Sequence, residues 1–87
     1  MNLRNYPETT AHVSITRQSW KLGQIEGEVQ VATYQWEFQW CFRQKQLLVK
    51  PSLGRALIKE PLERFLERSD YKLEAGSNYT FTLRSRL

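Results

Sequence analysis

The side chains that most often carry catalysis or bind metals are scarce in this sequence of 87 residues. It has one cysteine, Cys41, and one histidine, His12. A lone cysteine excludes an internal disulfide and a cysteine-based zinc site, and a lone histidine offers no partner histidine to build a general acid–base pair. Neither glycine-rich phosphate-binding pattern, GxGxxG or GxxxxGK[ST], occurs. We therefore expect no enzyme activity, no metal and no cofactor.

Long apolar runs are missing as well. No uninterrupted apolar run exceeds three residues, as in Leu47–Val49, whereas a membrane-spanning helix needs about 20. The first ten residues, MNLRNYPETT, contain no apolar stretch of the kind found in signal peptides. From these absences we expect a soluble cytoplasmic protein without membrane association.

What the chain does contain is enough for one hydrophobic core. Three Trp, four Tyr and four Phe are present, and each large ring can bury roughly 150–250 Å². Thirteen Lys and Arg against nine Asp and Glu give a net charge of +4, which is modest compared with a dedicated duplex-DNA binder. The composition predicts one globular domain, residues 11–87, preceded by an N-terminal arm, residues 1–10, which is polar and interrupted by Pro7.

Strict alternation of apolar and polar residues predicts β-strands along most of the domain. The clearest alternation is at residues 34–43, where every second side chain is a large ring: Tyr34, Trp36, Phe38, Trp40 and Phe42. Because successive side chains of a strand point to opposite faces, these rings share one face. The same pattern predicts strands from residue 11, at 25–31, at 46–50 and at 78–86, with turns at 21–24 and 44–45.

A helix is predicted after Pro51. Ser52 is a candidate N-cap because its hydroxyl can accept a hydrogen bond from a first-turn N–H group. Apolar residues then recur at near-helical spacing: Leu53, Leu57, Leu62, Phe65 and Leu66. Pro61 lacks an N–H group, so we expect a kink or two abutting pieces. Residues 70–73 are β-like and should form a terminal hairpin with the last strand.

Together these elements predict an α+β fold. We expect a twisted antiparallel sheet of about five strands, with one kinked or broken helix packed on its aromatic face. The aromatic strand should lie centrally, since its rings need neighbours on both sides. Burial under the helix also favours a core role for the rings over a platform on which nucleic-acid bases stack.

Two groups of basic residues are candidates for binding anions or nucleic acid. Lys50, Ser52 and Arg55 surround the predicted helix N-terminus, whose free N–H groups attract anions. Arg43, Arg84 and Arg86 share the polar parity of their strands and would cluster if those strands were neighbours. Ordinary capping and solvated cations account for the same residues. Trp20, in or beside a turn, is a candidate interaction anchor, although a packing role fits it equally well.

Three segments carry a resemblance to a known family: ITRQSW (residues 15–20), WEFQWCF (36–42) and PSLGRALIKEPLERFLERSDYKLEAG (51–76). Over most of the chain beyond the arm, the sequence resembles a family of small uncharacterised cyanobacterial proteins, a domain of unknown function. The resemblance implies a cytoplasmic bacterial protein. It implies no activity and brings no functional residues.

Two functions remain open from the sequence. The first is a small non-enzymatic module for protein interaction or assembly, whose partner is another protein or a second copy paired along a sheet edge. The alternative, which we favour less, is weak binding of RNA or single-stranded nucleic acid through a basic cluster. That binding would depend strongly on salt.

Overall fold

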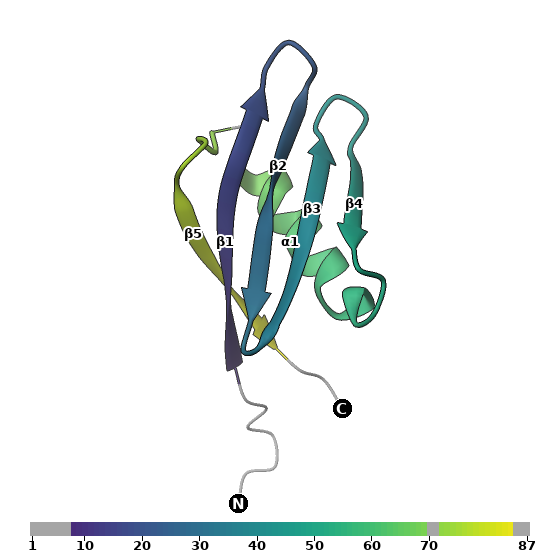
Figure 1. The fold of residues 1–87 in the computed structure, drawn as a ribbon, viewed down its shortest axis with the longest axis vertical. Helices are drawn as coiled ribbons and strands as arrows, with labels where there is room; N and C mark the ends of the chain where they lie inside the picture. Colours follow the sequence, from purple (N-terminus) through teal and green to yellow (C-terminus); the bar gives the residue numbers. More distant parts are fainter. Residues whose placement is uncertain (1–7, 70–71, 85–87) are drawn as a thin grey trace, which may run out of the picture.

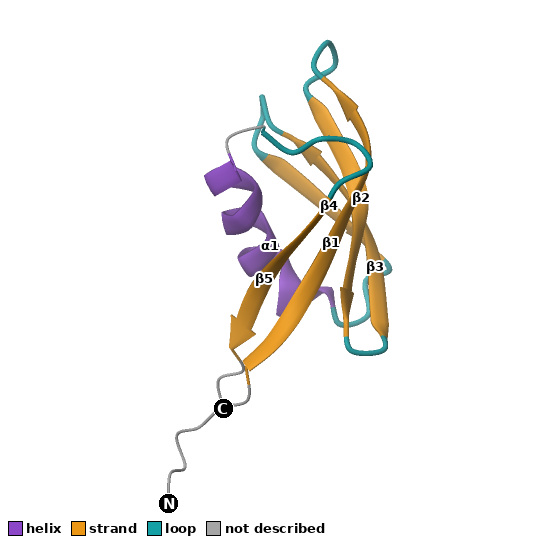
Figure 2. Cartoon of the chain, turned by 90° about the vertical axis from the view of Figure 1, so that its left-hand side faces the viewer, coloured by secondary structure: helices purple, strands orange, loops and turns teal. Residues whose placement is uncertain are grey.

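The computed structural model describes residues 8–69 and 72–84 (Figure 1). Its elements are β1 (Glu8–Ser19), β2 (Gln24–Val31), β3 (Tyr34–Cys41), β4 (Gln46–Lys50), α1 (Arg55–Ser69) and β5 (Asn78–Arg84). The five strands form one sheet in the order β4-β3-β2-β1-β5, and every neighbouring pair is antiparallel. The helix lies on one face of the sheet and leaves the other face bare (Figure 2). The predicted α+β fold is confirmed.

The strand faces follow the alternation of the sequence. The buried residues of the sheet come from every second position of β1 to β4: Ala11, Val13, Ile15, Ile25, Val29, Trp36, Phe38, Trp40, Leu47 and Val49. Tyr79, Phe81 and Leu83 of β5 pack against this core while partly exposed. One ring of β3 is not buried as predicted. Tyr34 is exposed and stacks on Trp36, with 6.1 Å between ring centroids.

Gly27 lies where the sheet is most crowded. It is in register with Ile15 on β1 and Phe38 on β3. A Cβ atom at this position would collide with the Ser14 carbonyl oxygen and lie 3.0 Å from the Phe38 ring. The register of β1 shifts immediately beyond, between Ile15 and Arg17, so this glycine has both a close aromatic neighbour and an adjacent bulge, two features that a glycine within a strand often marks.

The start of α1 corrects the predicted capping. The helix begins at Arg55, and Gly54, with φ of +75°, precedes it in place of Ser52. The reason is that the loop after β4 lies against Trp36. The Trp36 Nε1–H group donates a hydrogen bond to the Leu53 carbonyl (2.9 Å), and a Cβ on Gly54 would lie 3.2 Å from the Trp36 ring.

The later start also changes the buried stripe of α1. Ile58, Leu62 and Leu66 are buried at a spacing of four residues, with Phe65 packed beside them. The predicted stripe was wrong at its first two members, because the Leu53 and Leu57 side chains are 81% and 73% exposed. Of the two alternatives predicted at Pro61, a kink or a break, the break does not occur, since α1 continues through Pro61. Pro61 removes the donor for the Leu57 carbonyl, and Leu57 is exposed enough for water to replace it.

The predicted terminal hairpin is absent from the part of the chain that the structure describes. Asp70 and Tyr71 lie outside the described residues, while Lys72 and Leu73 are not in a strand. Leu73 is instead buried in the core, and its carbonyl accepts a hydrogen bond from Gln18 Nε2 (2.6 Å). The last strand, β5, pairs with β1 from the other end of the chain.

The start of β1 and the position of β3 in the sheet also differ from the prediction. β1 already begins at Glu8, so residues 8–10 of the expected arm belong to the sheet. The central strand is β2 rather than the aromatic strand β3, which lies second from the edge. β3 nevertheless has a partner on each side, β2 and β4, so its rings have the neighbours they need.

Candidate interaction surfaces

The two hairpin turns at one end of the sheet form a joint surface, which we call the tip (Figure 1). It consists of residues 20–23 between β1 and β2 and residues 42–45 between β3 and β4. Trp20 packs edge-on against Phe42, with 5.4 Å between ring centroids and 62° between the ring planes. The Phe42 N–H group donates a hydrogen bond to the Gly23 carbonyl (2.9 Å). The two turns are therefore held together rather than hanging free.

Arg43 adds a second connection between the turns. Its Nη2 atom donates a hydrogen bond to the Trp20 carbonyl (3.0 Å). Its aliphatic stem lies over Gly23, where an added Cβ would come within 2.9 Å of the Arg43 Cδ atom. Gly23 also has a φ of +73°, which side chains rarely adopt. The sequence needs glycine here both for the turn and for the arginine that crosses it.

The tip is both apolar and cationic. The Trp20 side chain is 53% exposed and that of Leu22 is 67% exposed, although both are large and hydrophobic. The charged residues of the two turns are Lys21, Arg43 and Lys45, and neither turn contains an acid. The predicted anchor at Trp20 is thus placed on the surface. Leu22 was missed, although a leucine beside a tryptophan in a glycine-containing turn was a visible signal.

The group at the helix start is loosely assembled. Arg55 Nη1 donates a long hydrogen bond (3.4 Å) to the Val49 carbonyl, so this guanidinium is directed back to β4. Lys50 is the last residue of β4, in register with Glu37, and Ser52 is exposed in the loop that follows. The three residues are close in the chain, but they do not converge on the helix N-terminus as an anion site requires.

The arginine group is not brought together. Arg43 belongs to the turn between β3 and β4, whereas Arg84 is the last residue of β5. Because β2 and β1 lie between β3 and β5, the strands that carry the two arginines are not neighbours. Arg86 lies outside the described residues.

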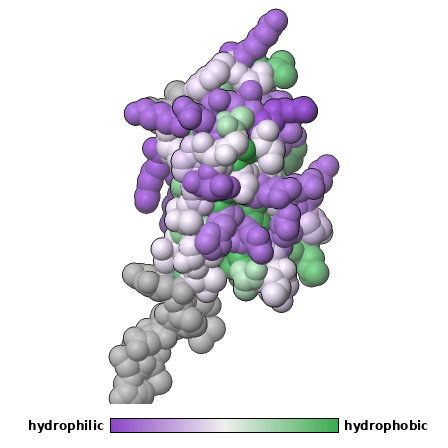
Figure 3. Space-filling view, turned by 60° about the vertical axis from the view of Figure 1, so that its left-hand side comes forward, coloured by the Kyte–Doolittle hydropathy of each residue, from purple (hydrophilic) through white to green (hydrophobic). Residues whose placement is uncertain are grey.

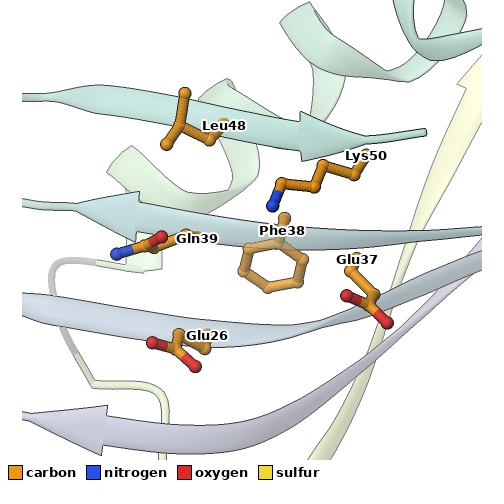
Figure 4. Close-up of a pocket in the computed structure, with 6 residues that line it drawn as sticks. All are labelled: Glu26, Glu37, Phe38, Gln39, Leu48 and Lys50. Atoms are coloured by element: carbon orange, nitrogen blue, oxygen red, sulfur yellow. The ribbon is translucent and has the colours of Figure 1, made fainter. Parts of the chain in front are cut away.

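The bare face of the sheet carries a shallow hollow with mixed charge (Figure 4). Its volume is about 210 Å³, and its rim includes Glu26 from β2, Glu37 from β3 and Lys50 from β4. The Lys50 side chain extends towards β3 (Figure 4). Glu37 is also directly opposite Glu28, which accepts a hydrogen bond from Gln35 Nε2 (3.0 Å). Paired like charges cost stability, and they make this face unfavourable for phosphate.

The scarce reactive residues both lie on the bare face. His12 is exposed on β1, between Gln30 of β2 and Thr80 of β5. Cys41 is half-buried at the end of β3, 3.9 Å from the Gln24 amide nitrogen. Over residues 8–69 and 72–84, no three His, Cys, Asp or Glu residues are grouped as metal ligands. The one helix in that part of the chain is not long and apolar enough to cross a membrane.

The fold and its surfaces define a small open-faced α+β domain, with five antiparallel strands covered by a helix on one side. The chain belongs to the family described as "Protein of unknown function (DUF3146)", whose model matches residues 7–86. This agrees with the resemblance to an uncharacterised family. No curated protein and no solved structure matches the chain.

Proposed function

We propose that the protein is a small non-enzymatic interaction module that binds a partner protein through the tip. The observation that carries this proposal is the exposed Trp20 ring, which is packed on Phe42 and tied through its carbonyl to Arg43. Tryptophan and arginine are the residues most often found as binding hot spots. A side chain held in place before binding loses less conformational entropy on association than a free one.

Chemistry at the tip also indicates the kind of partner. An apolar pocket could take the Trp20 and Leu22 side chains, and an acidic rim would complement Lys21, Arg43 and Lys45. Isolated exposed hydrophobic residues are normal on protein surfaces. The tip differs because two such residues lie beside three cations and no acid. Binding to this surface should therefore weaken as salt is added.

The alternative of nucleic-acid binding has less support. It depended on a shared basic cluster, and the strand order separates Arg43 from Arg84. The bare face carries Glu26, Glu28 and Glu37, which repel phosphate. No observation favours it over a protein partner, so it enters below as an outcome of the experiment.

The test compares affinity capture by three forms of the tagged protein from a native lysate of the source organism. The forms are the wild type, the tip variant W20A/L22A, and L53A/L57A as a matched control. The control also removes two exposed hydrophobic side chains, but from the helix side at the far end of the sheet. Each capture is run with and without nuclease and at two salt concentrations.

We expect a defined protein that survives nuclease and is retained equally by the wild type and L53A/L57A. Its recovery should fall by at least about tenfold with W20A/L22A, as loss of a hot spot predicts. Light scattering on the purified protein shows whether that partner is a second copy. Equal recovery by W20A/L22A would refute the role of the tip, and recovery of nucleic acid alone would favour the alternative.

A further inference from the structure

A second surface, apart from the tip, lies between α1 and the edge strand β5. A groove of about 450 Å³ separates the two elements. Its helix wall includes Arg64, Phe65 and Arg68, which are spaced so that they lie on one side of α1. Its strand wall includes Thr80, Phe81 and Thr82. In Figure 3, which brings this side of the molecule forward, apolar surface lies between hydrophilic side chains.

The lining shows that the groove follows the free edge of β5. Thr80, Phe81 and Thr82 are consecutive, so their side chains alternate between the two faces of the sheet. A hollow that contacts all three must run along the edge between those faces. β5 pairs with β1 on its other side and is the last strand in the sheet order. Within residues 8–69 and 72–84 no strand pairs with this outer side, so its backbone groups are open to another strand.

Little in β5 blocks such pairing. Proteins commonly protect an edge strand with proline, charge or short length. β5 has no proline, and residues 78–83, NYTFTL, carry no charge. It is seven residues long, which is about 23 Å of edge at roughly 3.3 Å per residue. The opposite edge strand, β4, is shorter and ends in Lys50 followed by Pro51.

Two residues that line the groove, Phe65 and Phe81, are aromatic and already packed together. Phe65 stacks on Phe81, with 5.3 Å between ring centroids and 26° between the ring planes. Tyr79 also packs on Phe65, with 6.2 Å between ring centroids, and its hydroxyl accepts a hydrogen bond from the Glu74 N–H group (3.2 Å). A ligand side chain would therefore meet a prearranged aromatic surface.

The charged residues that line the groove indicate the charge of its ligand. Arg64 and Arg68 line the groove, and no acid is among its lining residues. Arg64 makes one exposed ion pair, with Glu60 (3.5 Å), along the helix. Exposed pairs of this kind are weak, so a ligand carboxylate can compete for the guanidinium.

We infer that the groove binds an extended peptide that adds to the sheet as a sixth strand beside β5 and carries both apolar and acidic side chains on the face that it turns to α1. Backbone hydrogen bonds to β5 hold the peptide. Every second side chain of the added strand faces α1. Of these, the apolar ones rest on Phe65 and Phe81, and the acidic ones, two residues along, reach Arg64 and Arg68. This inference shares the module class of the proposed function, but it assigns a different site and a different ligand.

The experiment selects peptides from a phage-displayed library of random linear sequences against the purified protein. Selected peptides are synthesised, and their affinities are measured for the wild type, R64E/R68E and K21E/K45E. The two variants change net charge equally, and all four positions are exposed, so folding should be preserved. Binding is also mapped by amide chemical shifts and by hydrogen exchange of the β5 backbone.

We expect enrichment of peptides in which Asp or Glu lies two residues from a β-branched or aromatic residue, so that both side chains face α1 in the added strand. R64E/R68E should bind them at least about tenfold more weakly, while K21E/K45E and W20A/L22A bind as the wild type does. Amides on the free edge of β5 should exchange more slowly in the complex. Failure to enrich such peptides, equal binding by R64E/R68E, or shifts confined to the tip would each overturn the inference. This result does not depend on the tip. If the tip binds no partner, only the comparison of the wild type with W20A/L22A in the capture experiment fails.

Discussion

At the residue scale, Gly27 and Trp20 differ in their surroundings, because Gly27 is closely packed and Trp20 is exposed. Gly27 lies in the middle of the sheet, where the Ser14 carbonyl and the Phe38 ring leave no room for a Cβ atom. Trp20 is 53% exposed, yet it is held by Phe42 and Arg43. The first position is demanded by packing. The Trp20 ring packs on Phe42 and is also exposed, and it is this exposed part that we propose binds a partner.

The change Gly27→Ala should lower the free energy of unfolding by about 1–3 kcal/mol, the usual cost of overpacking. At an open strand position alanine would instead be neutral or stabilising, because glycine loses more conformational entropy on folding. Urea denaturation followed by circular dichroism measures the difference. Gln30→Ala, an exposed position on the same strand, is the control and should change stability by less than about 0.5 kcal/mol. An unchanged midpoint for Gly27→Ala would contradict the crowding described here.

At the scale of elements, α1 shows how two readings of one sequence can compete. Leu57 and Ile58 are adjacent apolar residues, and each has an apolar residue four positions away, Leu53 before Leu57 and Leu62 after Ile58. Periodicity alone could not choose between them. The choice depends on the loop after β4, which lies against Trp36 and delays the helix to Arg55. That contact joins segments 17 residues apart, so it is invisible to a local pattern.

This difference gives a matched pair of variants on one helical turn. Ile58→Ala should lower the free energy of unfolding by about 2–4 kcal/mol, because it opens a cavity in the core. Leu57→Ala should change it by less than about 0.5 kcal/mol, because the side chain is exposed and alanine favours helix. Thermal and urea unfolding of both variants provide the measurement. Equal losses, or a larger loss for Leu57→Ala, would restore the stripe predicted from the sequence.

The two candidate binding surfaces also belong to pairs of elements. The tip joins two hairpin turns, and the groove joins the helix to the last strand. Trp20 could be singled out from the sequence because a large ring in a turn is unusual. Phe65, Phe81, Arg64 and Arg68 could not, because nothing local places α1 beside β5. The proposed cluster of Arg43 and Arg84 fails for the same reason, since parity says which face a residue takes and not which strand lies next to it.

At the scale of the whole molecule, a single core links the sheet and the helix. Buried residues of β1 to β4 and of α1 form one cluster with Leu73, and the aromatic side chains of β5 pack against it. β1 is the strand that connects the chain ends, since it pairs with both β2 and β5. No described element has a separate core on which it could remain folded.

We therefore expect unfolding in one cooperative transition. Tryptophan fluorescence reports mainly the surroundings of β3, where Trp36 and Trp40 are buried, whereas far-ultraviolet circular dichroism reports the helix and all strands. The two signals should give coincident urea curves with the same midpoint and slope. Curves that separate would show that α1 or β5 melts independently, and would contradict a single core.

The sequence by itself determined the strands, their inward faces, the turns and the α+β class. These follow from alternation, proline and glycine, which act within a few residues of the chain. Only the tertiary structure decided the strand order, the buried face of α1, the meeting of two turns at the tip, and the groove beside β5. Each of these depends on contacts between distant segments, and such contacts are chosen by the packing of the whole core rather than by any local pattern.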